Sequence, residues 1–201
     1  MKAQMQLAAH SSLGVEFDFL DGIHECTAEE LERVDPALKA YFPTTDYGPY
    51  REWWNAREHD LYDRYDETVE TVAAKLEEGH YDGVVGFSQG GAVAATVCAL
   101  HLTRRRPLPD LRWAWFQSTF VPRHKTAAPL FLEVKTDASL KVLTTTHSED
   151  PVVPAKATAA LADAFADARL VLFPGKAHKL VSLKDPNSDP AQQVRAFFDG
   201  L

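Results

Sequence analysis

The stretch Tyr81-Asp-Gly-Val-Val-Gly-Phe-Ser88-Gln-Gly-Gly-Ala-Val-Ala-Ala-Thr-Val97 decides the fold that this sequence predicts. The apolar, β-branched residues 81–85 predict a short buried strand, and residues 92–102 predict a helix. Between them, Gly86-Phe-Ser-Gln-Gly90 matches the G-x-S-x-G pattern in the strand–turn–helix setting that this pattern requires. We therefore expect Ser88 to lie on a sharp turn, with its hydroxyl exposed as a candidate nucleophile.

The glycines around Ser88 have a steric explanation. A residue on so tight a turn has strained backbone angles. Side chains two positions before or after it would collide with the adjacent backbone. Gly86, Gly90 and Gly91 remove those side chains, so that the helix can pack closely. The N-terminus of that helix carries partial positive charge, and we expect the backbone N–H of Gln89 to stabilise a developing oxyanion. The structural alternative is a plain glycine-rich turn that happens to hold a serine.

Length, charge and cysteine content limit the classes of protein. The chain has 201 residues, and we expect residues 1–201 to form a single domain with a full core. A net charge of −8 argues against a nucleic-acid surface. No apolar run is long enough to span a membrane, and the two cysteines form neither a disulfide framework nor a zinc pattern. We expect a cytoplasmic protein without metal or cofactor; the oligomeric state is left open.

Elements that alternate along the chain predict the fold class. We expect strands over residues 15–20, 81–85, 111–117, 140–146 and 169–173. Helices are expected over residues 3–13, 28–34, 63–78, 92–102 and 154–165, with a final one opening at Asp189-Pro190. This alternation predicts an α/β protein with a mostly parallel sheet and helices on both faces.

A long segment interrupts this alternation. Residues 23–62 show no sheet pattern and are rich in proline and aromatic residues, so they could form a cover or insert over the site. Tyr50, Trp53 and Trp54 are our candidates for the wall of an acyl pocket. Aromatic residues that merely pack their own loop are an equally weighted alternative.

A nucleophilic serine needs a base, and that base needs an orienting acid. Functional groups in an open parallel sheet gather beyond the carboxyl ends of the strands. Asp150 follows the expected strand 140–146, and His178 follows the expected strand 169–173. We expect these two residues to form a catalytic triad with Ser88. Glu149 or Asp137 could replace the acid, and His24 or His147 could replace the base.

The whole chain resembles the FSH-type serine hydrolases, a compact branch of the α/β-hydrolases. The resemblance rests on Glu16-Phe-Asp-Phe-Leu-Asp-Gly22, Gly48-Pro-Tyr-Arg-Glu-Trp-Trp54, Gly86-Phe-Ser-Gln-Gly-Gly91, Asp150-Pro-Val-Val-Pro154 and the residues from Pro174-Gly175 to His178. It implies an esterase or thioesterase that acts on a small-molecule or carrier-bound acyl substrate. Some fungal members that are similar in these regions release polyketide chains or act on pathway intermediates.

The resemblance also implies one difference in the sheet. Family members usually begin with a strand that ends in a Leu-His-Gly-type loop and supplies a second oxyanion donor. This chain starts after that loop, so we expect the usual first strand to be missing. Two other functions stay open: acid–base catalysis without an acyl-enzyme, such as epoxide opening or cyclisation by His178 and Asp150, and a catalytically impaired binding protein.

Overall fold

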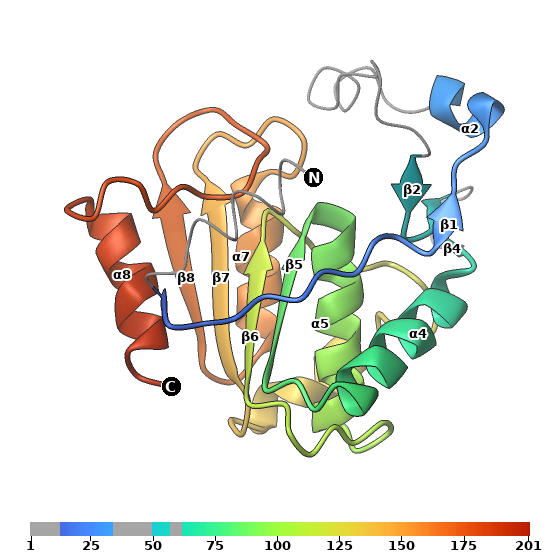
Figure 1. Cartoon of the computed structure of the whole chain (residues 1–201), viewed down its shortest axis with the longest axis horizontal. Helices are drawn as coiled ribbons and strands as arrows, with labels where there is room; N and C mark the ends of the chain where they lie inside the picture. The colour runs from blue at the N-terminus through green and yellow to red at the C-terminus, as the bar shows by residue number, and fades with distance from the viewer. Residues whose placement is uncertain (1–12, 34–49, 57–61) are drawn as a thin grey trace.

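A parallel sheet forms the centre of the protein. The computed structural model describes residues 13–33, 50–56 and 62–201. Within them the sheet has four strands in the spatial order β5 (Gly83–Phe87), β6 (Trp113–Gln117), β7 (Lys141–His147) and β8 (Ala168–Phe173). All three pairings are parallel, so the carboxyl ends of the four strands lie at the same end of the sheet, at the top of the view in Figure 1. The predicted α/β class is confirmed.

Helices cover both faces of this sheet, as predicted (Figure 1). Along β6, Ala114 and Phe116 belong to one hydrophobic cluster, while Trp113 and Trp115 belong to the cluster on the opposite face. The first cluster is completed by four helices: α4 (Tyr65–Glu78), α5 (Ser88–Leu102), α6 (Leu130–Glu133) and α7 (Ala155–Ala164). The second cluster is completed by α8 (Asp189–Phe198). Burial of both faces explains why β6 has no exposed residue.

Helix α4 shows how the hydrophobic pattern places an element. Tyr65, Val69, Val72, Ala73 and Leu76 recur at helical spacing, and all five are buried against the first cluster. The remaining face is charged. The helix ends at Glu78, where the N–H of the next glycine bonds back to the last turn. None of the described helices is long and apolar enough to cross a membrane.

The expected strand over residues 15–20 is wrong. This segment is extended but pairs with no strand among the described residues, and it crosses the face of the sheet that also carries α8 (Figure 1). Leu13 and Val15 pack against the second cluster, as do Val85 and Phe87 of β5. The alternating pattern therefore reflects contact with the sheet face and not membership of the sheet. Among the described residues, β5 pairs with β6 alone and forms an edge of the sheet.

The segment 23–62 contains more structure than its sequence predicts. Its described parts form two small antiparallel pairs, β1 (His24–Glu25) with β2 (Arg51–Glu52) and β3 (Asn55–Ala56) with β4 (Tyr62–Asp63). The expected short helix appears as α2 (Ala28–Arg33). Thr27 and Glu30 form a capping box at its start, since each side chain accepts the backbone N–H of the other residue.

Two further differences concern short elements. The chain between Thr119 and Ser139, for which the sequence predicts no helix or strand, holds α6 and the 3₁₀ turn η2 (Val134–Thr136). The sequence predicts Asp189 as the N-cap of the final helix, but Ser188 occupies that position and Asp189 is the first residue of α8. The helix expected over residues 3–13 falls almost entirely outside the described residues.

Candidate active site

Ser88 sits on the sharp turn that its neighbours predict. Strand β5 ends at Phe87 and α5 begins at once, with Ser88 at a φ of 52°. Such a left-handed angle is costly for a residue with a side chain and is typical of functional turns. A Cβ on Gly86 would lie 2.5 Å from the carbonyl oxygen of Gly90 and 2.6 Å from the Cα of Gly91. The absence of a side chain at position 86 therefore lets the helix fold back against the strand.

The other two glycines leave room for different neighbours. A Cβ on Gly91 would lie 2.8 Å from the Cβ of Thr119, in the loop after β6. A Cβ on Gly90 would lie 3.0 Å from the indole nitrogen of Trp53. Gly91 thus permits close packing of α5 on the sheet edge, whereas Gly90 makes space for an aromatic side chain beside the nucleophile.

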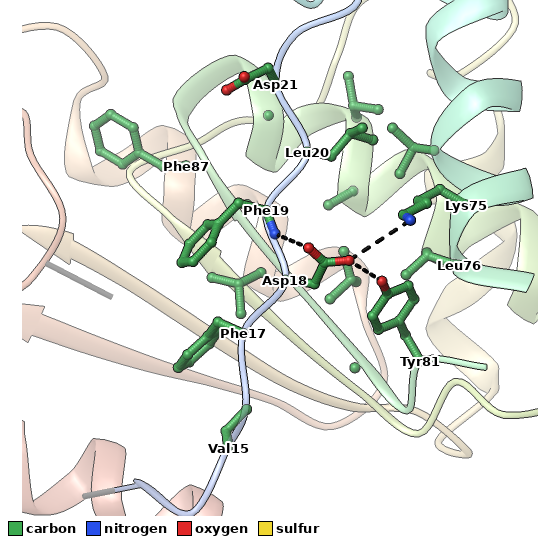
Figure 2. A pocket seen from close by; sticks show the side chains of 18 of the residues that line it. Val15, Phe17, Asp18, Phe19, Leu20, Asp21, Lys75, Leu76, Tyr81 and Phe87 are labelled. Atoms are coloured by element: carbon green, nitrogen blue, oxygen red, sulfur yellow. Dashed lines mark hydrogen bonds and ion pairs between the residues drawn. The ribbon is translucent and has the colours of Figure 1, made fainter. Parts of the chain in front are cut away.

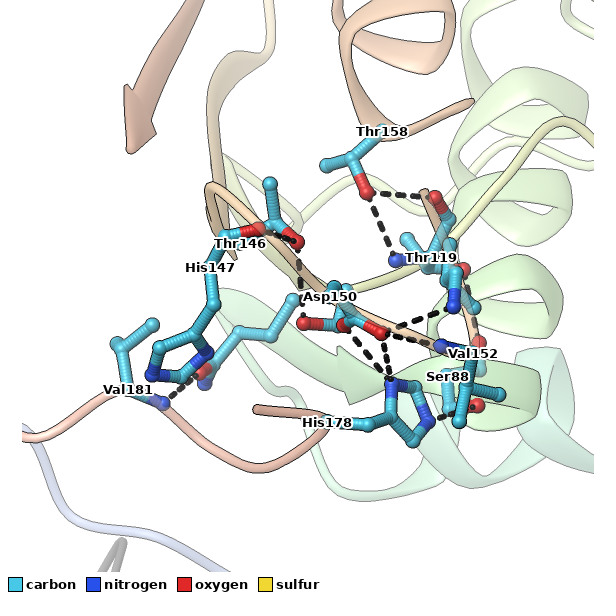
Figure 3. A network of polar contacts seen from close by, with 12 residues as sticks. Ser88, Thr119, Thr146, His147, Asp150, Val152, Thr158, His178 and Val181 are labelled. Carbon is cyan, nitrogen blue, oxygen red and sulfur yellow. Dashed lines mark hydrogen bonds and ion pairs between the residues drawn. The ribbon is translucent and has the colours of Figure 1, made fainter. Parts of the chain in front are cut away.

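The structure brings Ser88, His178 and Asp150 together in one chain of hydrogen bonds (Figure 3). The Nε2 atom of His178 lies 3.1 Å from the Oγ of Ser88. On the other side of the ring, Nδ1 lies 2.9 Å from Oδ2 of Asp150 and 3.1 Å from Oδ1. The side chains of His178 and Asp150 are fully buried. A serine, an imidazole and a carboxylate in this order are the groups that nucleophilic acyl transfer requires.

Two backbone amides fix the carboxylate of Asp150. Its Oδ1 accepts hydrogen bonds from the N–H groups of Val152 and Val153, both at 2.9 Å. The tight turn after β7 therefore orients the carboxylate before any proton moves. The two alternative acids lie elsewhere: Glu149 is exposed, and Asp137 caps its own loop through the N–H of Ser139.

The loop that carries His178 is held over the sheet. His178 follows β8, whereas Ser88 follows β5 at the other edge of the described sheet, so the chain must return across it. Gln117, the last residue of β6, anchors this return because its Oε1 accepts the N–H of Val181 at 3.1 Å. The ring of Phe87 contacts the His178 ring with 4.8 Å between centroids.

Among the described residues, Ser88 Oγ bonds to the imidazole of His178 and to neither alternative base. His24 lies beside α4, with its Nε2 atom 2.9 Å from the hydroxyl oxygen of Thr68. His147 is buried at the end of β7 near Phe173, and burial, with a smaller contribution from Lys179, lowers its pKa below 6.5. The same burial disfavours a positive charge on this imidazole, close to Asp150 and His178.

A threonine that the sequence analysis missed supports the nucleophile turn. The hydroxyl of Thr119 donates to the carbonyl oxygen of Ser88 at 2.7 Å. Thr119 is fully buried, and its own backbone N–H and carbonyl both bond to the hydroxyl of Thr158 on α7. The sequence offers no motif for Thr119, only its place two residues after the end of the strand next to β5. Gln89, the expected oxyanion donor, lies in the first turn of α5, where backbone N–H groups have no partner within the helix.

The three expected pocket residues have different surroundings. Trp54 is 2% exposed and stacks on Tyr62 with 5.0 Å between ring centroids, so it belongs to the core. Trp53 is half-buried and lines a groove. Tyr50 is half-buried too, and its hydroxyl has no partner among the described residues. The structure therefore places Trp53, and not Trp54, in the lining of this groove.

The groove runs between the segment 15–22 and the free edge of β5 (Figure 2). Its volume is about 390 Å³, and it reaches Phe87 and Gly90, which flank Ser88. Asp18 joins its two sides, because it accepts the hydroxyl of Tyr81 and lies 3.8 Å from the ammonium group of Lys75. This hydrogen bond is the main reason that the pKa of Asp18 lies below 3.8. Over the described ranges, no group of three or more potential ligands could hold a metal ion.

Comparisons with known proteins find relatives that are named hydrolases or esterases. The chain is 33% identical over 125 residues to a protein named hydrolase FUB4 from Fusarium oxysporum, covering 61% of this chain and 42% of that protein. Esterase OVCA2 of Mus musculus is 36% identical over 126 residues, covering 57% of this chain and 54% of the esterase. Esterase OVCA2 of Danio rerio is 28% identical over 178 residues, covering 80% and 75%. The chain thus spans about half the length of the first two relatives.

Solved structures share the fold at low identity. Zea mays acyl-protein thioesterase 2 is 18% identical, with a TM-score of 0.53 over 75% of this chain and 74% of that one. An alpha/beta hydrolase enzyme from the metagenome of Mar Chica lagoon sediments is 11% identical, with a TM-score of 0.51 over 67% and 69%. The FSH1 serine hydrolase profile matches residues 2–188, nearly the whole chain. With the α/β-hydrolase fold and this profile match together, the chain belongs to the FSH1 family of serine hydrolases.

Proposed function

We propose that this protein hydrolyses esters or thioesters through an acyl-enzyme on Ser88. The observation that carries the proposal is the hydrogen-bonded series from Ser88 Oγ through His178 to the buried carboxylate of Asp150. The names of the relatives, two of them esterases, and of the plant thioesterase support the same class of reaction.

The geometry assigns each residue a step. The Nε2 atom of His178 takes the hydroxyl proton of Ser88 as Oγ attacks the acyl carbonyl carbon. Asp150 holds the imidazole with Nδ1–H directed at its carboxylate and stabilises the imidazolium. His178 then gives the proton to the departing alkoxide or thiolate. In the second half-reaction His178 deprotonates a water molecule, which attacks the acyl carbon and releases the acid, and the proton returns to Ser88.

The oxyanion of the tetrahedral intermediate needs donors that are already in place. The backbone N–H of Gln89 is our candidate, because it lies in the first turn of α5 directly after Ser88. The hydrogen bond from Thr119 to the Ser88 carbonyl fixes the peptide plane that joins Ser88 to Gln89. Thr119 therefore acts as a positioning residue for this donor.

The substrate we propose is an acyl chain on a small molecule or a carrier. The groove beside Ser88 is lined mainly by apolar side chains, including Phe17, Phe19, Val93 and Trp53. An apolar acyl group fits such a lining. A polyketide chain, as the resemblance to fungal members implies, belongs to this class.

A cytoplasmic location fits the two cysteines. Both Cys26 and Cys98 are free thiols, and Cys98 is completely buried. Burial raises its pKa well above 9.0, so it is an unreactive core residue. Fractionation of cells that express the tagged protein would test this location; recovery of the protein in a secreted or membrane fraction would contradict it.

The function is tested with a panel of p-nitrophenyl esters and acyl thioesters of increasing chain length. We expect hydrolysis by the wild type and loss of all measurable turnover in Ser88→Ala. The same panel with Ser182→Ala, a change at an exposed serine after the His178 loop, serves as the matched control. Hydrolysis that survives Ser88→Ala would exclude the acyl-enzyme and favour acid–base catalysis by His178 and Asp150.

A further inference from the structure

The side-chain amide of Gln89 connects the nucleophile turn to the aromatic segment 50–56. Its Oε1 atom accepts the backbone N–H of Trp53 at 3.3 Å, and its Nε2 atom donates to the carbonyl oxygen of Trp54 at 3.0 Å. We propose that Gln89 is a positioning residue that holds the Trp53 indole beside Ser88 and thereby selects the acyl groups that fit there. This inference rests on the proposed function, because it concerns substrate selection at the same serine.

Trp53 is held from two sides. Its N–H is bound by Gln89 on α5, and its carbonyl oxygen accepts the hydroxyl of Thr68 on α4. Since the Thr68 hydroxyl has one proton and gives it to Trp53, the 2.9 Å contact to His24 must be donated by the Nε2–H of the histidine. Thr68 is completely buried, so this second anchor is part of the core. Gln89 is the anchor on the side of the nucleophile.

The indole of Trp53 lies against the start of α5, next to the nucleophile turn. A Cβ on Gly90 would come within 3.0 Å of the indole nitrogen, so the ring rests against the second residue after Ser88. Both Trp53 and Gly90 line the groove. A shift of the Trp53 backbone would therefore change the width of the groove where it reaches the nucleophile.

Trp54 keeps the segment from moving as a whole. Its ring is buried among Tyr62, Tyr65 and Phe120, with centroid distances of 5.0, 5.0 and 6.5 Å. The segment thus has a fixed core side at Trp54 and a groove side at Trp53. The amide of Gln89 bonds to the backbone of both residues and so fixes the orientation of Trp53 relative to Trp54.

A glutamine suits this position because the end of its side chain carries both a donor, the NH₂ group, and an acceptor, the carbonyl oxygen. Gln89→Met keeps the length but removes both hydrogen bonds. Gln89→Glu keeps an acceptor for Trp53 but has no donor for Trp54. Gln192→Met, on the exposed surface of α8, makes the same chemical change away from the groove and is the matched control.

The first readout is amide hydrogen exchange at Trp53, which needs no activity. We expect Gln89→Met to increase the exchange rate by about tenfold or more, because the acceptor of this N–H is lost. Gln89→Glu should restore most of the protection, and Gln192→Met should leave it as in the wild type. Unchanged exchange in Gln89→Met would overturn the proposed anchoring of Trp53.

The second readout is the hydrolysis of p-nitrophenyl acetate and p-nitrophenyl octanoate. In Gln89→Met we expect the KM for octanoate to rise about tenfold relative to that for acetate, with kcat changing less than KM, because the longer chain loses its fixed wall. A double-mutant cycle with Trp53→Ala tests the route. If Gln89 acts through Trp53, Gln89→Met should hardly change the ratio of the KM values for octanoate and acetate in the Trp53→Ala background.

The outcomes separate this inference from the proposed function. If the wild type hydrolyses neither ester, the proposed function fails, and the exchange measurement still tests whether Gln89 anchors Trp53. If the wild type is active but Gln89→Met has the same ratio of KM values for octanoate and acetate, the proposed role of Gln89 in selecting acyl groups is wrong. If Gln89→Met changes the octanoate-to-acetate ratio of KM values equally with and without Trp53, Gln89 acts by another route. That result would also overturn the inference.

Discussion

The Nε2 atom of His178 lies 3.1 Å from the Oγ atom of Ser88, although the two residues are 90 positions apart in the chain. They follow opposite edge strands of the described sheet, β5 and β8. The contact exists because the loop after β8 turns back over the carboxyl ends of the strands and is tied to Gln117 at the end of β6. The catalytic geometry that we propose thus depends on the order of the strands and on one buried glutamine.

Replacement of Ser88 by glycine should separate strain from function. Ser88 has a φ of 52°, which glycine adopts freely and alanine does not. We expect both Ser88→Gly and Ser88→Ala to be inactive, with Ser88→Gly more stable by about 1 kcal/mol. Urea denaturation of the two variants measures the difference. If Ser88→Ala is at least as stable as Ser88→Gly, the turn is not strained as described.

Asp150→Asn should remove activity and keep the fold. Asparagine can still accept the N–H groups of Val152 and Val153 through its carbonyl oxygen. Its NH₂ group would face Nδ1 of His178, however, and would favour the tautomer with a proton on Nε2, which cannot accept the proton of Ser88. We expect kcat to fall by about 10⁴-fold. Near-normal kcat in a folded Asp150→Asn protein would show that Asp150 does not orient the base.

Trp53 and Trp54 should differ when each is replaced by alanine. Trp54→Ala leaves a cavity among stacked rings, and we expect the free energy of unfolding to fall by about 3–5 kcal/mol. Trp53→Ala changes a half-buried groove residue, so its main effect should be a raised KM for long acyl chains. Thermal denaturation and ester kinetics on both variants test this division. The reverse pattern would assign the pocket wall to Trp54.

His101 should make the protein less stable in mild acid. Burial, and secondarily Arg104, lowers its folded-state pKa below 6.5, whereas Asp137 opposes the shift. The unfolded chain therefore binds more protons in this range, so stability is lost as the pH falls below about 6.5. Its Nδ1 also accepts the N–H of Leu108 at 2.9 Å and must stay unprotonated to do so.

The measurement is urea denaturation at about pH 7 and about pH 5. Asparagine can accept the N–H of Leu108 but does not titrate, so His101→Asn should lose less stability between the two pH values than the wild type. The exposed His80 provides the control variant His80→Asn. An equal loss in wild type and His101→Asn would assign the acid sensitivity to other groups.

Much of the fold followed from the sequence for a physical reason. Parallel strands place their carboxyl ends at one edge, so the residues after each strand had to gather there. The nearness of Ser88, Asp150 and His178 could therefore be predicted without coordinates. The turn at Ser88 could be predicted as well, because Gly86 is explained only by a close backbone approach.

The parts that could not be predicted depend on contacts between distant segments. The alternation over residues 15–20 cannot tell a strand in the sheet from a segment lying across its face, since both bury alternate side chains. Nothing in the Trp53-Trp54 pair shows which ring enters the core. Thr119 carries no motif, and its contact with Ser88 arises from the packing of two loops.

The most direct test is the intact mass of the protein after reaction with a fluorophosphonate probe. We predict one adduct on the wild type, none on Ser88→Ala, and strongly slowed labelling of His178→Ala, with circular dichroism showing that all three are folded. This result would mean that Ser88 is a nucleophile activated by His178. No adduct on the folded wild type, or equal labelling of Ser88→Ala, would contradict the proposed catalytic centre.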